Sequence, residues 1–268
     1  MHPPSVTNFL AVVLAALILG CAPPPEEPDY DDPDAGPHPD APILLSITPE
    51  DGADGVDPLP IFHLTFDRHI DATTLAKHRF NLTSGDKQYG LLSLYDPTQK
   101  EVLAWMGGLL LPECTWVFSI RKGLFGLNGA QVPPGVQVTF RTAKDSEFKT
   151  PFHVRAFQGE IVPIFEKHCS SCHGGAGPGI ANLKLDSKEN ILETAISVPS
   201  TGRPEWQRIA PTRPGESYLL YKLTSDNVIT GLRMPRTMDG SSAPPALSKD
   251  EKAALFDWIT TGAHFVDP

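Results

Sequence analysis

Cys169, Cys172 and His173 form a C-x-x-C-H pattern, in Cys169-Ser170-Ser171-Cys172-His173, and this pattern constrains the chain more than any other. It has the spacing of c-type haem attachment. Each of two thiols three positions apart can add to a haem vinyl group, and the adjacent histidine then lies under the iron as its proximal ligand. The pattern predicts one covalently attached haem c, with Cys169, Cys172 and His173 as cofactor-binding residues. The chain around it must then fold about a flat apolar group.

Two other interpretations of the pattern require different surroundings. A thioredoxin-like redox pair would need a βαβ setting, and a zinc site would need a second pair of ligands that no further nearby cysteine supplies. Cys114 does not offer a partner for a disulfide or a redox pair with the motif cysteines, which agrees with haem attachment. Cys114 begins an apolar strand pattern with no Lys, Arg or His beside it, so we expect it to be a small core residue rather than a reactive thiol.

The segment from residue 42 to residue 143 has the alternation of β-strands. Turn signals such as Asp51-Gly52 and Asn128-Gly129 separate runs of period two, and residues 71–78 could form one short helical turn. Strands at this density favour an all-β sandwich. The apolar members of three runs are Phe62, Leu64 and Phe66; Trp116, Phe118 and Ile120; and Val136, Val138 and Phe140.

With ITPEDGADGV, LTFDRHIDATTL and VTFRT, this segment resembles bacterial Ig-like domains of the surface-layer type. The resemblance implies that the residues named above are core and turn residues. His63, His69 and His78 are expected to be surface or loop residues rather than metal ligands, because no pair has metal-binding spacing backed by a cysteine.

Two helices are expected near the ends of residues 155–268. Ile161, Ile164 and Phe165 fall at i, i+3 and i+4, which predicts a short helix running into Cys169 with Pro163 in its first turn. Residues 248–251 form a capping box before an apolar face that ends at Gly262. The two helices are expected to cross and close over the haem.

This part of the chain resembles the class I c-type cytochrome domain found in bacterial lipoproteins. Besides the C-x-x-C-H pattern, the residues that carry the resemblance are Arg233-Met234-Pro235, Leu247-Ser248 and Trp258-Ile259-Thr260-Thr261-Gly262-Ala263. It implies an all-α cytochrome c domain after the sandwich, hence a two-domain fold. It also implies that Met234 is the distal iron ligand, so that His173 and Met234 are the metal ligands.

Other residues stay open as ligands or partners of the haem. Met238 is the nearest competitor of Met234, and His168 and His264 are weaker candidates. The haem propionates need partners. Arg208, Arg213, Arg233, Tyr218 and Trp258 could provide them, and no spacing distinguishes among these five.

The N-terminus carries an export pattern. Residues 9–20 are an unbroken apolar run, too short to span a bilayer but of the size of a signal-peptide core, and Cys21 follows. This resembles the bacterial lipoprotein signal, although Ile18 stands where leucine is preferred and the first residues hold no Lys or Arg. The resemblance implies a signal peptide over 1–20 and a lipid on Cys21 that anchors the chain at the cell envelope, at the outer membrane or the periplasmic face.

Charge divides the rest of the chain. Residues 22–41 hold 7 acidic and no basic residues, 42–150 hold 12 and 10, and 151–268 hold 13 and 12, which sums to the net charge of -10. The proline-rich acidic stretch over 21–41 cannot bury a core and is expected to be a disordered tether. Residues 144–154 are expected to be a linker between the two folded parts. Neither folded part has the excess of Lys and Arg that is typical of a nucleic-acid-binding protein.

Two functions are compatible with these patterns. The first is a membrane-tethered mono-haem electron carrier that reacts with redox partner proteins and transforms no small-molecule substrate, and so is not an enzyme. The second is an adhesion or assembly module whose Ig-like domain binds a partner, with a haem domain that senses a ligand or supplies electrons to that partner. The chain has no second C-x-x-C-H pattern, which excludes a multihaem wire and a di-haem peroxidase.

Overall fold

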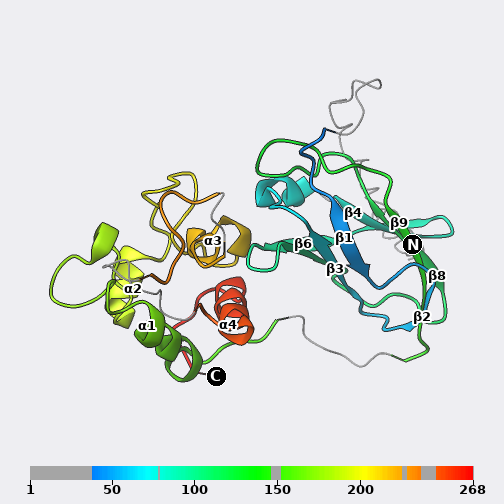
Figure 1. Ribbon diagram of the computed structural model, residues 1–268. Coiled ribbons are helices and arrows are strands. Elements are labelled where there is room, and N and C mark those ends of the chain that lie inside the picture. The colour runs from blue at the N-terminus through cyan, green and yellow to red at the C-terminus, as the bar shows by residue number, and fades with distance from the viewer. Residues whose placement is uncertain (1–37, 78, 146–151, 225–227, 237–245, 268) are drawn as a thin grey trace, which may run out of the picture. The chain divides into compact units, whose positions relative to one another are not determined.

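The computed structural model describes residues 38–77, 79–145, 152–224, 228–236 and 246–267, and all residues from Gly36 on belong to one compact unit (Figure 1). The predicted signal peptide, Cys21 and most of the predicted tether lie outside the described residues, as do His78 and Met238. In the described part of the chain, no helix is long and apolar enough to cross a membrane.

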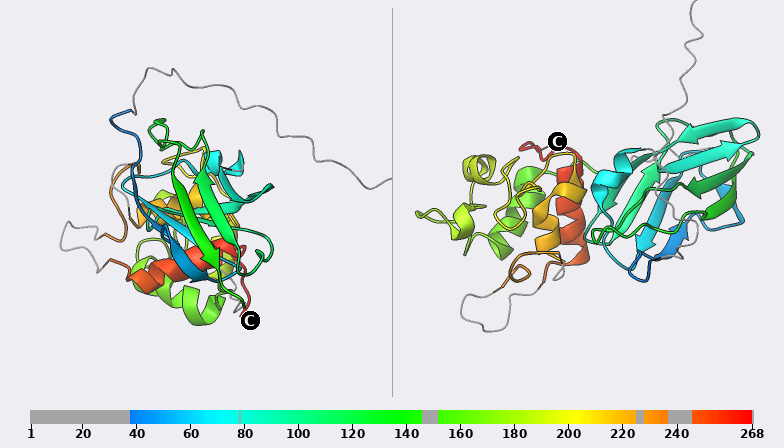
Figure 2. Two further views of the ribbon diagram at one scale, coloured as in Figure 1. Left: turned by 90° about the vertical axis from the view of Figure 1, so that its right-hand side faces the viewer. Right: turned by 90° about the horizontal axis from the view of Figure 1, so that it is seen from above.

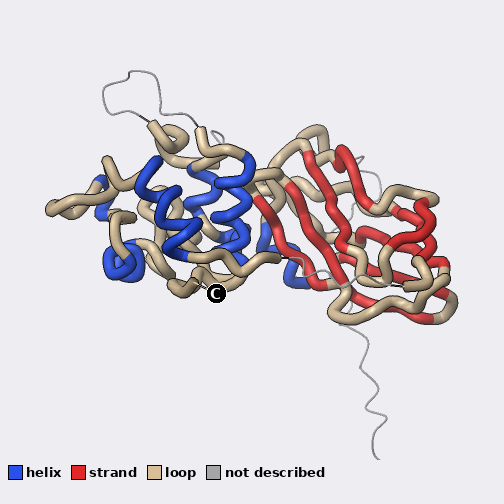
Figure 3. Tube along the Cα trace, turned by 90° about the horizontal axis from the view of Figure 1, so that it is seen from below, coloured by secondary structure: helices blue, strands red, loops and turns tan. Residues whose placement is uncertain are grey.

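Two sheets form the N-terminal part. One has the order β1-β3-β7-β6, and the other has the order β2-β9-β8-β4-β5 (Figure 1, Figure 3). Neighbouring strands pair antiparallel except β2 and β9, which pair parallel. The strands are β1 (Leu44–Thr48), β2 (Ala53–Val56), β3 (Ile61–Phe66), β4 (Phe80–Ser84), β5 (Lys87–Gly90), β6 (Leu92–Asp96), β7 (Glu101–Trp105), β8 (Thr115–Ile120) and β9 (Gln137–Thr142).

The core between the sheets confirms the period-two prediction. Alternate residues of β3, β8 and β9 are buried, because successive side chains of a strand point to opposite faces. Phe62 of β3 stacks on Phe118 of β8 with ring centroids 4.4 Å apart, and Phe140 of β9 meets Phe62 edge to face at 5.5 Å. The short helical turn expected near residue 71 is the 3-10 helix η1 (Ala72–Lys77). The prediction of a β-rich part built from two sheets is therefore confirmed.

The histidines of this part differ from expectation at one position. The side chain of His63 is 45% exposed and pairs with Glu101. His69, expected at the surface or in a loop, is buried, and its Nδ1 lies 2.8 Å from the hydroxyl of Tyr95. The prediction failed because the packing that buries His69 comes from residues distant in sequence. Cys114 is half-buried against the core of the sandwich.

The prediction of an all-α cytochrome c domain after the sandwich is wrong. In the described residues, the strands form two sheets in the N-terminal part, and the helices of the C-terminal part are short and separated by loops (Figure 2). Turn-forming Gly and Pro residues interrupt the region between the two expected helices, which limits helix length there. The elements are η2 (Phe157–Ile161), α1 (Val162–His168), η3 (Ile180–Asn182), α2 (Lys188–Thr194), η4 (Pro214–Glu216), α3 (Tyr218–Lys222) and α4 (Lys249–Thr260).

The two expected terminal helices are nevertheless present. α1 has Pro163 in its first turn and ends at the cysteine pair. α4 starts with the predicted capping box, in which Ser248 and Glu251 each accept a hydrogen bond from the other's backbone N–H. Phe165 of α1 meets Trp258 of α4 edge to face at 5.9 Å, so the two helices pack together. This contact places the end of α1 beside a cavity.

Candidate functional site

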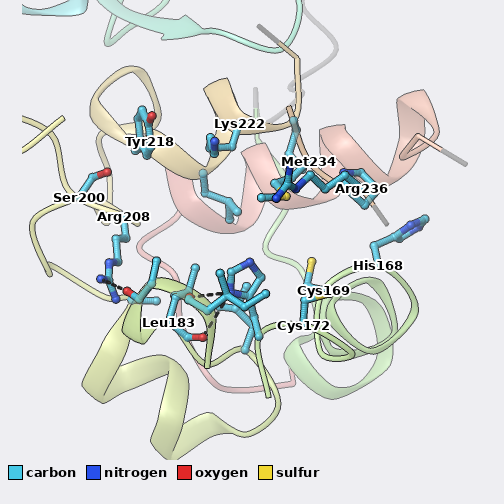
Figure 4. A pocket seen from close by; sticks show the side chains of 18 of the residues that line it. His168, Cys169, Cys172, Leu183, Ser200, Arg208, Tyr218, Lys222, Met234 and Arg236 are labelled. Atoms are coloured by element: carbon cyan, nitrogen blue, oxygen red, sulfur yellow. Dashed lines mark hydrogen bonds between the residues drawn. The ribbon is translucent and has the colours of Figure 1, made fainter. Parts of the chain in front are cut away.

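A cavity of about 440 Å³ lies in the C-terminal part, within the size range of small-molecule and cofactor sites. Cys169, Cys172 and His173 line the cavity, and Figure 4 shows the two cysteines on one wall and Lys222 of α3, Met234 and Arg236 on the opposite wall. The expectation that α4 closes over the cavity is wrong. α4 packs beside α3, and the residues that line the cavity include residues of α3 but none of α4. The lining also includes the apolar side chains of Ile180, Leu183, Leu185, Ile209, Leu219, Leu223 and Leu247.

The end of α1 directs the cysteine pair and the histidine to this cavity. Cys169 caps the helix, and its carbonyl accepts hydrogen bonds from the backbone N–H groups of Cys172 (3.1 Å) and His173 (2.9 Å). The tight turn brings all three side chains onto the cavity wall, and both thiols are free. The structure thus brings together the three residues that the motif predicts to act together.

The setting of Cys169 does not suit a thioredoxin-like pair. Reactive thiols of that class have a lowered pKa, often at a helix N-terminus, whereas Cys169 stands at the C-terminus of α1. Burial, with a smaller contribution from Cys172, raises the pKa of the Cys169 thiol to about 12. The Cys169 thiol is therefore protonated and does not act as a thiolate nucleophile at neutral pH.

His173 is held with one ring nitrogen available. Its Nδ1 lies 3.2 Å from the carbonyl oxygen of Ile180 and 3.3 Å from that of Leu183. A carbonyl oxygen only accepts, so Nδ1 carries the proton, and in the neutral ring Nε2 keeps a lone pair. Burial lowers the pKa of His173, which favours this neutral form.

Gly179 lies directly against the carbonyl of Leu183, one of the two carbonyls that orient His173. Its φ of +73° is disfavoured for residues with a side chain, and a Cβ at this position would collide with the Leu183 carbonyl oxygen. The sequence gives no sign of this contact, because backbone carbonyls have no pattern of their own. Ile180 and Leu183 are thus positioning residues that sequence analysis missed.

Met234 lines the cavity from the wall opposite the cysteines (Figure 4). Its backbone N–H donates to the carbonyl of Lys222 at 2.7 Å. The Lys222 ammonium in turn donates to the carbonyls of Thr230 (3.0 Å) and Leu232 (2.7 Å), which fastens this segment to α3. Sequence analysis missed Lys222, because its partners are backbone atoms.

The other residues considered as haem ligands or propionate partners fall into two groups. His168, Arg208 and Tyr218 line the cavity, whereas His264, Arg213, Arg233 and Trp258 are not among its lining residues. His168 is already engaged, because its Nε2 lies 3.0 Å from Glu251. Arg208 donates to the carbonyls of Ala181, Asn182 and Thr194 at 2.6 to 2.8 Å and so also holds the loop after His173.

The charges around the cavity have one sign. Lys167, Arg208, Lys222 and Arg236 line it, and the described lining residues include no Asp or Glu. Burial lowers the pKa of both Arg208 and Lys222, and the charge of Arg236 lowers that of Lys222 further. An anionic group of a bound molecule would offset the repulsion between the positive charges of Lys222 and Arg236.

The description of the chain as a metal-binding cytochrome c requires correction. Over the described ranges, no group of three or more His, Cys, Asp or Glu side chains could hold a metal ion, which also removes the zinc interpretation there. The protein's own side chains thus build no site for a bare metal ion in this part.

Comparisons with known proteins give partial likenesses only. No family model and no curated protein matches the chain. Among solved structures, the S-layer protein SbsC matches with a TM-score of 0.31 and 15% identity over 43% of this chain and 15% of the other. An L,D-transpeptidase from Mycobacterium smegmatis matches with a TM-score of 0.27 and 15% identity, over 37% and 39%. Native alpha-2-macroglobulin of E. coli matches with a TM-score of 0.30 and 18% identity, over 44% and 7%.

Proposed function

We propose that this protein attaches one haem covalently through Cys169 and Cys172 and transfers electrons to and from redox partner proteins. One observation carries the proposal: Cys169, Cys172, His173 and Met234 line the same cavity, with Met234 on the wall opposite the two cysteines (Figure 4). In sequence, Met234 is far from the cysteine motif.

The residues of the cavity fit a haem in three respects. Apolar side chains suit the faces of the macrocycle, and two cysteines that form no disulfide can add to its vinyl groups. The basic groups Arg208, Lys222 and Arg236 suit its carboxylates. The site therefore has complementary groups for each chemical part of the ligand.

Each residue has a distinct part in the proposed mechanism. Bound haem supplies one-electron redox chemistry. His173 would hold the iron of the group through Nε2, because the carbonyls of Ile180 and Leu183 hold the proton on Nδ1. Met234 would offer a soft, neutral thioether to the same group from the opposite wall. The apolar lining limits water around the site, and no substrate is transformed.

The spectrum of the haem-loaded protein tests this function. Expressed with a cytochrome-maturation system, the chain should show the pyridine haemochrome spectrum of haem c and a mass higher by one haem. If both axial positions are occupied, carbon monoxide should leave the ferrous spectrum unchanged. A chain that purifies folded but without covalently attached haem would refute the proposal.

A second function uses the sandwich as a binding module. The side chains of Ile43 and Leu45, at the edge strand β1, are 58% and 63% exposed, which favours contact with a partner. The haem part would then sense a ligand or supply electrons to that partner. Rapid binding of carbon monoxide in the same measurement would favour this second function, because a sensor needs an open iron position.

We also propose export and anchoring at the cell envelope through a lipid on Cys21. The support is the apolar run over 9–20 directly before that cysteine. Cys21→Ser should move the protein from the membrane to the soluble fraction, since the thiol is the site of lipidation. Fractionation with Cys114→Ala as the control checks this, and a serine variant that stays with the membrane would exclude the anchor.

A further inference from the structure

Two consecutive residues after the cysteine motif have a left-handed backbone. Ala181 has a φ of +59° and a ψ of +26°, and Asn182 has a φ of +54°. Residues with a Cβ disfavour this region, and such strain persists only where the surrounding structure holds it. The two carbonyls that flank this pair, those of Ile180 and Leu183, both meet Nδ1 of His173. The orientation of His173 therefore depends on a strained turn.

One side chain holds this turn in place. The guanidinium of Arg208 (Figure 4) donates to the carbonyls of Ala181 (2.8 Å) and Asn182 (2.7 Å), which belong to the left-handed pair itself. A further hydrogen bond, at 2.6 Å, goes to the carbonyl of Thr194, the last residue of α2. The planar fork of an arginine can join several acceptors in fixed directions, whereas a lysine ammonium is a point charge on a flexible stem. Arg208 thus ties the turn to the end of a helix.

We propose that Arg208 is a positioning residue for His173. It clamps residues 181–182 in their left-handed conformation, so that the carbonyls on either side of them hold the proton on Nδ1 and leave Nε2 free as a ligand. The consequence for iron ligation rests on the proposed haem function, whereas the clamp itself consists of protein atoms.

The backbone of Arg208 is fixed on both sides. Its N–H donates to the carbonyl of Val198 at 2.7 Å, and its carbonyl accepts from the N–H of Leu219 in α3 at 3.0 Å. An anchored backbone limits the positions that the guanidinium can reach, so the side chain determines where the carbonyls of the turn lie. The clamp therefore connects α3, which lies at the cavity, with the loop that orients His173.

The partners of Arg208 favour a positioning role over a purely electrostatic one. In the described part of the chain, its side-chain hydrogen bonds all go to backbone carbonyls, and the cavity lining includes no carboxylate. Burial lowers the pKa of Arg208, so its charge is held at a cost that no ion pair in the lining offsets. What these hydrogen bonds contribute is a fixed geometry of the turn.

The position of the proton on His173 tests the clamp without haem. In the haem-free full-length chain with isotope-labelled histidine, long-range proton–nitrogen correlation spectra in mildly alkaline buffer distinguish the Nδ1–H from the Nε2–H tautomer, and His173→Gln identifies the signal. The unchanged chain should show the Nδ1–H tautomer. Arg208→Lys keeps the charge but not the fork, so the ratio of Nδ1–H to Nε2–H should fall roughly fivefold, the equilibrium effect of about one net hydrogen bond. Arg208→Gln, which keeps a planar donor without the charge, should lower it as well.

Matched variants separate the clamp from general packing. Arg213→Lys, at an exposed arginine that pairs with Glu216, should leave the tautomer ratio unchanged. Ala181→Gly added to Arg208→Lys should restore much of the ratio, because glycine adopts a positive φ without the steric cost of a Cβ. A ratio that Arg208→Lys and Arg208→Gln leave unchanged, or that Ala181→Gly fails to restore, overturns the inference.

The reduction potential of the haem-loaded protein gives a second readout. A weaker hydrogen bond from Nδ1 makes the imidazole a poorer donor to ferric iron, so Arg208→Lys should raise the potential, whereas a role through charge alone predicts no change. An unchanged potential would overturn the effect of the clamp on the iron. If no haem attaches to the unchanged chain, the proposed function fails and the tautomer ratio still decides the clamp. If haem attaches and the ratio is the same in all variants, the clamp fails and the proposed function stands.

Discussion

Replacing Cys169 and Cys172 together by alanine will abolish covalent haem attachment. The two thiols lie on one wall of the cavity and are the only cysteines among its lining residues, so no other described side chain there can form a thioether with the vinyl groups. In a denaturing gel, haem staining at the position of the polypeptide should be present in the unchanged protein and absent in the double variant.

The same double variant should lose stability in its C-terminal part. A haem would fill the cavity beside α1 and α3, and binding that is specific to the folded state stabilises that state. We expect the helical signal in circular dichroism to melt at a lower temperature than in the haem-loaded protein.

Cys114→Ala is the matched control for attachment, because Cys114 packs against the core of the sandwich and does not line the cavity. It should retain full haem staining. Haem that stays on the double variant after denaturation would contradict the proposed attachment, whatever its effect on stability.

Met234→Ala should lower the reduction potential of the bound haem and open the iron to carbon monoxide. A thioether stabilises the ferrous state, so its loss favours the oxidised form. Because axial ligands set haem potentials over roughly 0.8 V, we expect a decrease on the order of 0.1 V or more. Redox titration measures the decrease, and loss of the methionine-to-iron charge-transfer band reports the missing bond.

Two controls locate the distal ligand. Met106→Ala, which alters packing against the sandwich core, should leave the potential unchanged. Met238→Ala should have a much smaller effect than Met234→Ala, and the opposite order would assign the ligand to Met238. Unchanged spectra in both variants would exclude methionine ligation and favour the sensor function.

Local patterns alone determined several features of this protein. The alternation in β3, β8 and β9 predicted the strands and the side chains that they bury, because the faces of a strand follow directly from its period of two. The capping box of α4 is likewise complete within four residues. The cysteine motif predicted three side chains that lie together, and they line one cavity because a single turn holds them.

Only the tertiary structure decided the rest. The carbonyls of Ile180 and Leu183 orient His173, and Arg208 and Lys222 fix the adjacent loops through other backbone atoms, which have no sequence signature. His69 is buried by packing against side chains distant in sequence, Tyr95 and Tyr221. An all-α domain was expected from two motif-bearing helices, but the described residues between them form mainly loops and short helices. Periodicity and caps act over a few residues, whereas cavities, buried partners and long loops depend on contacts between distant segments.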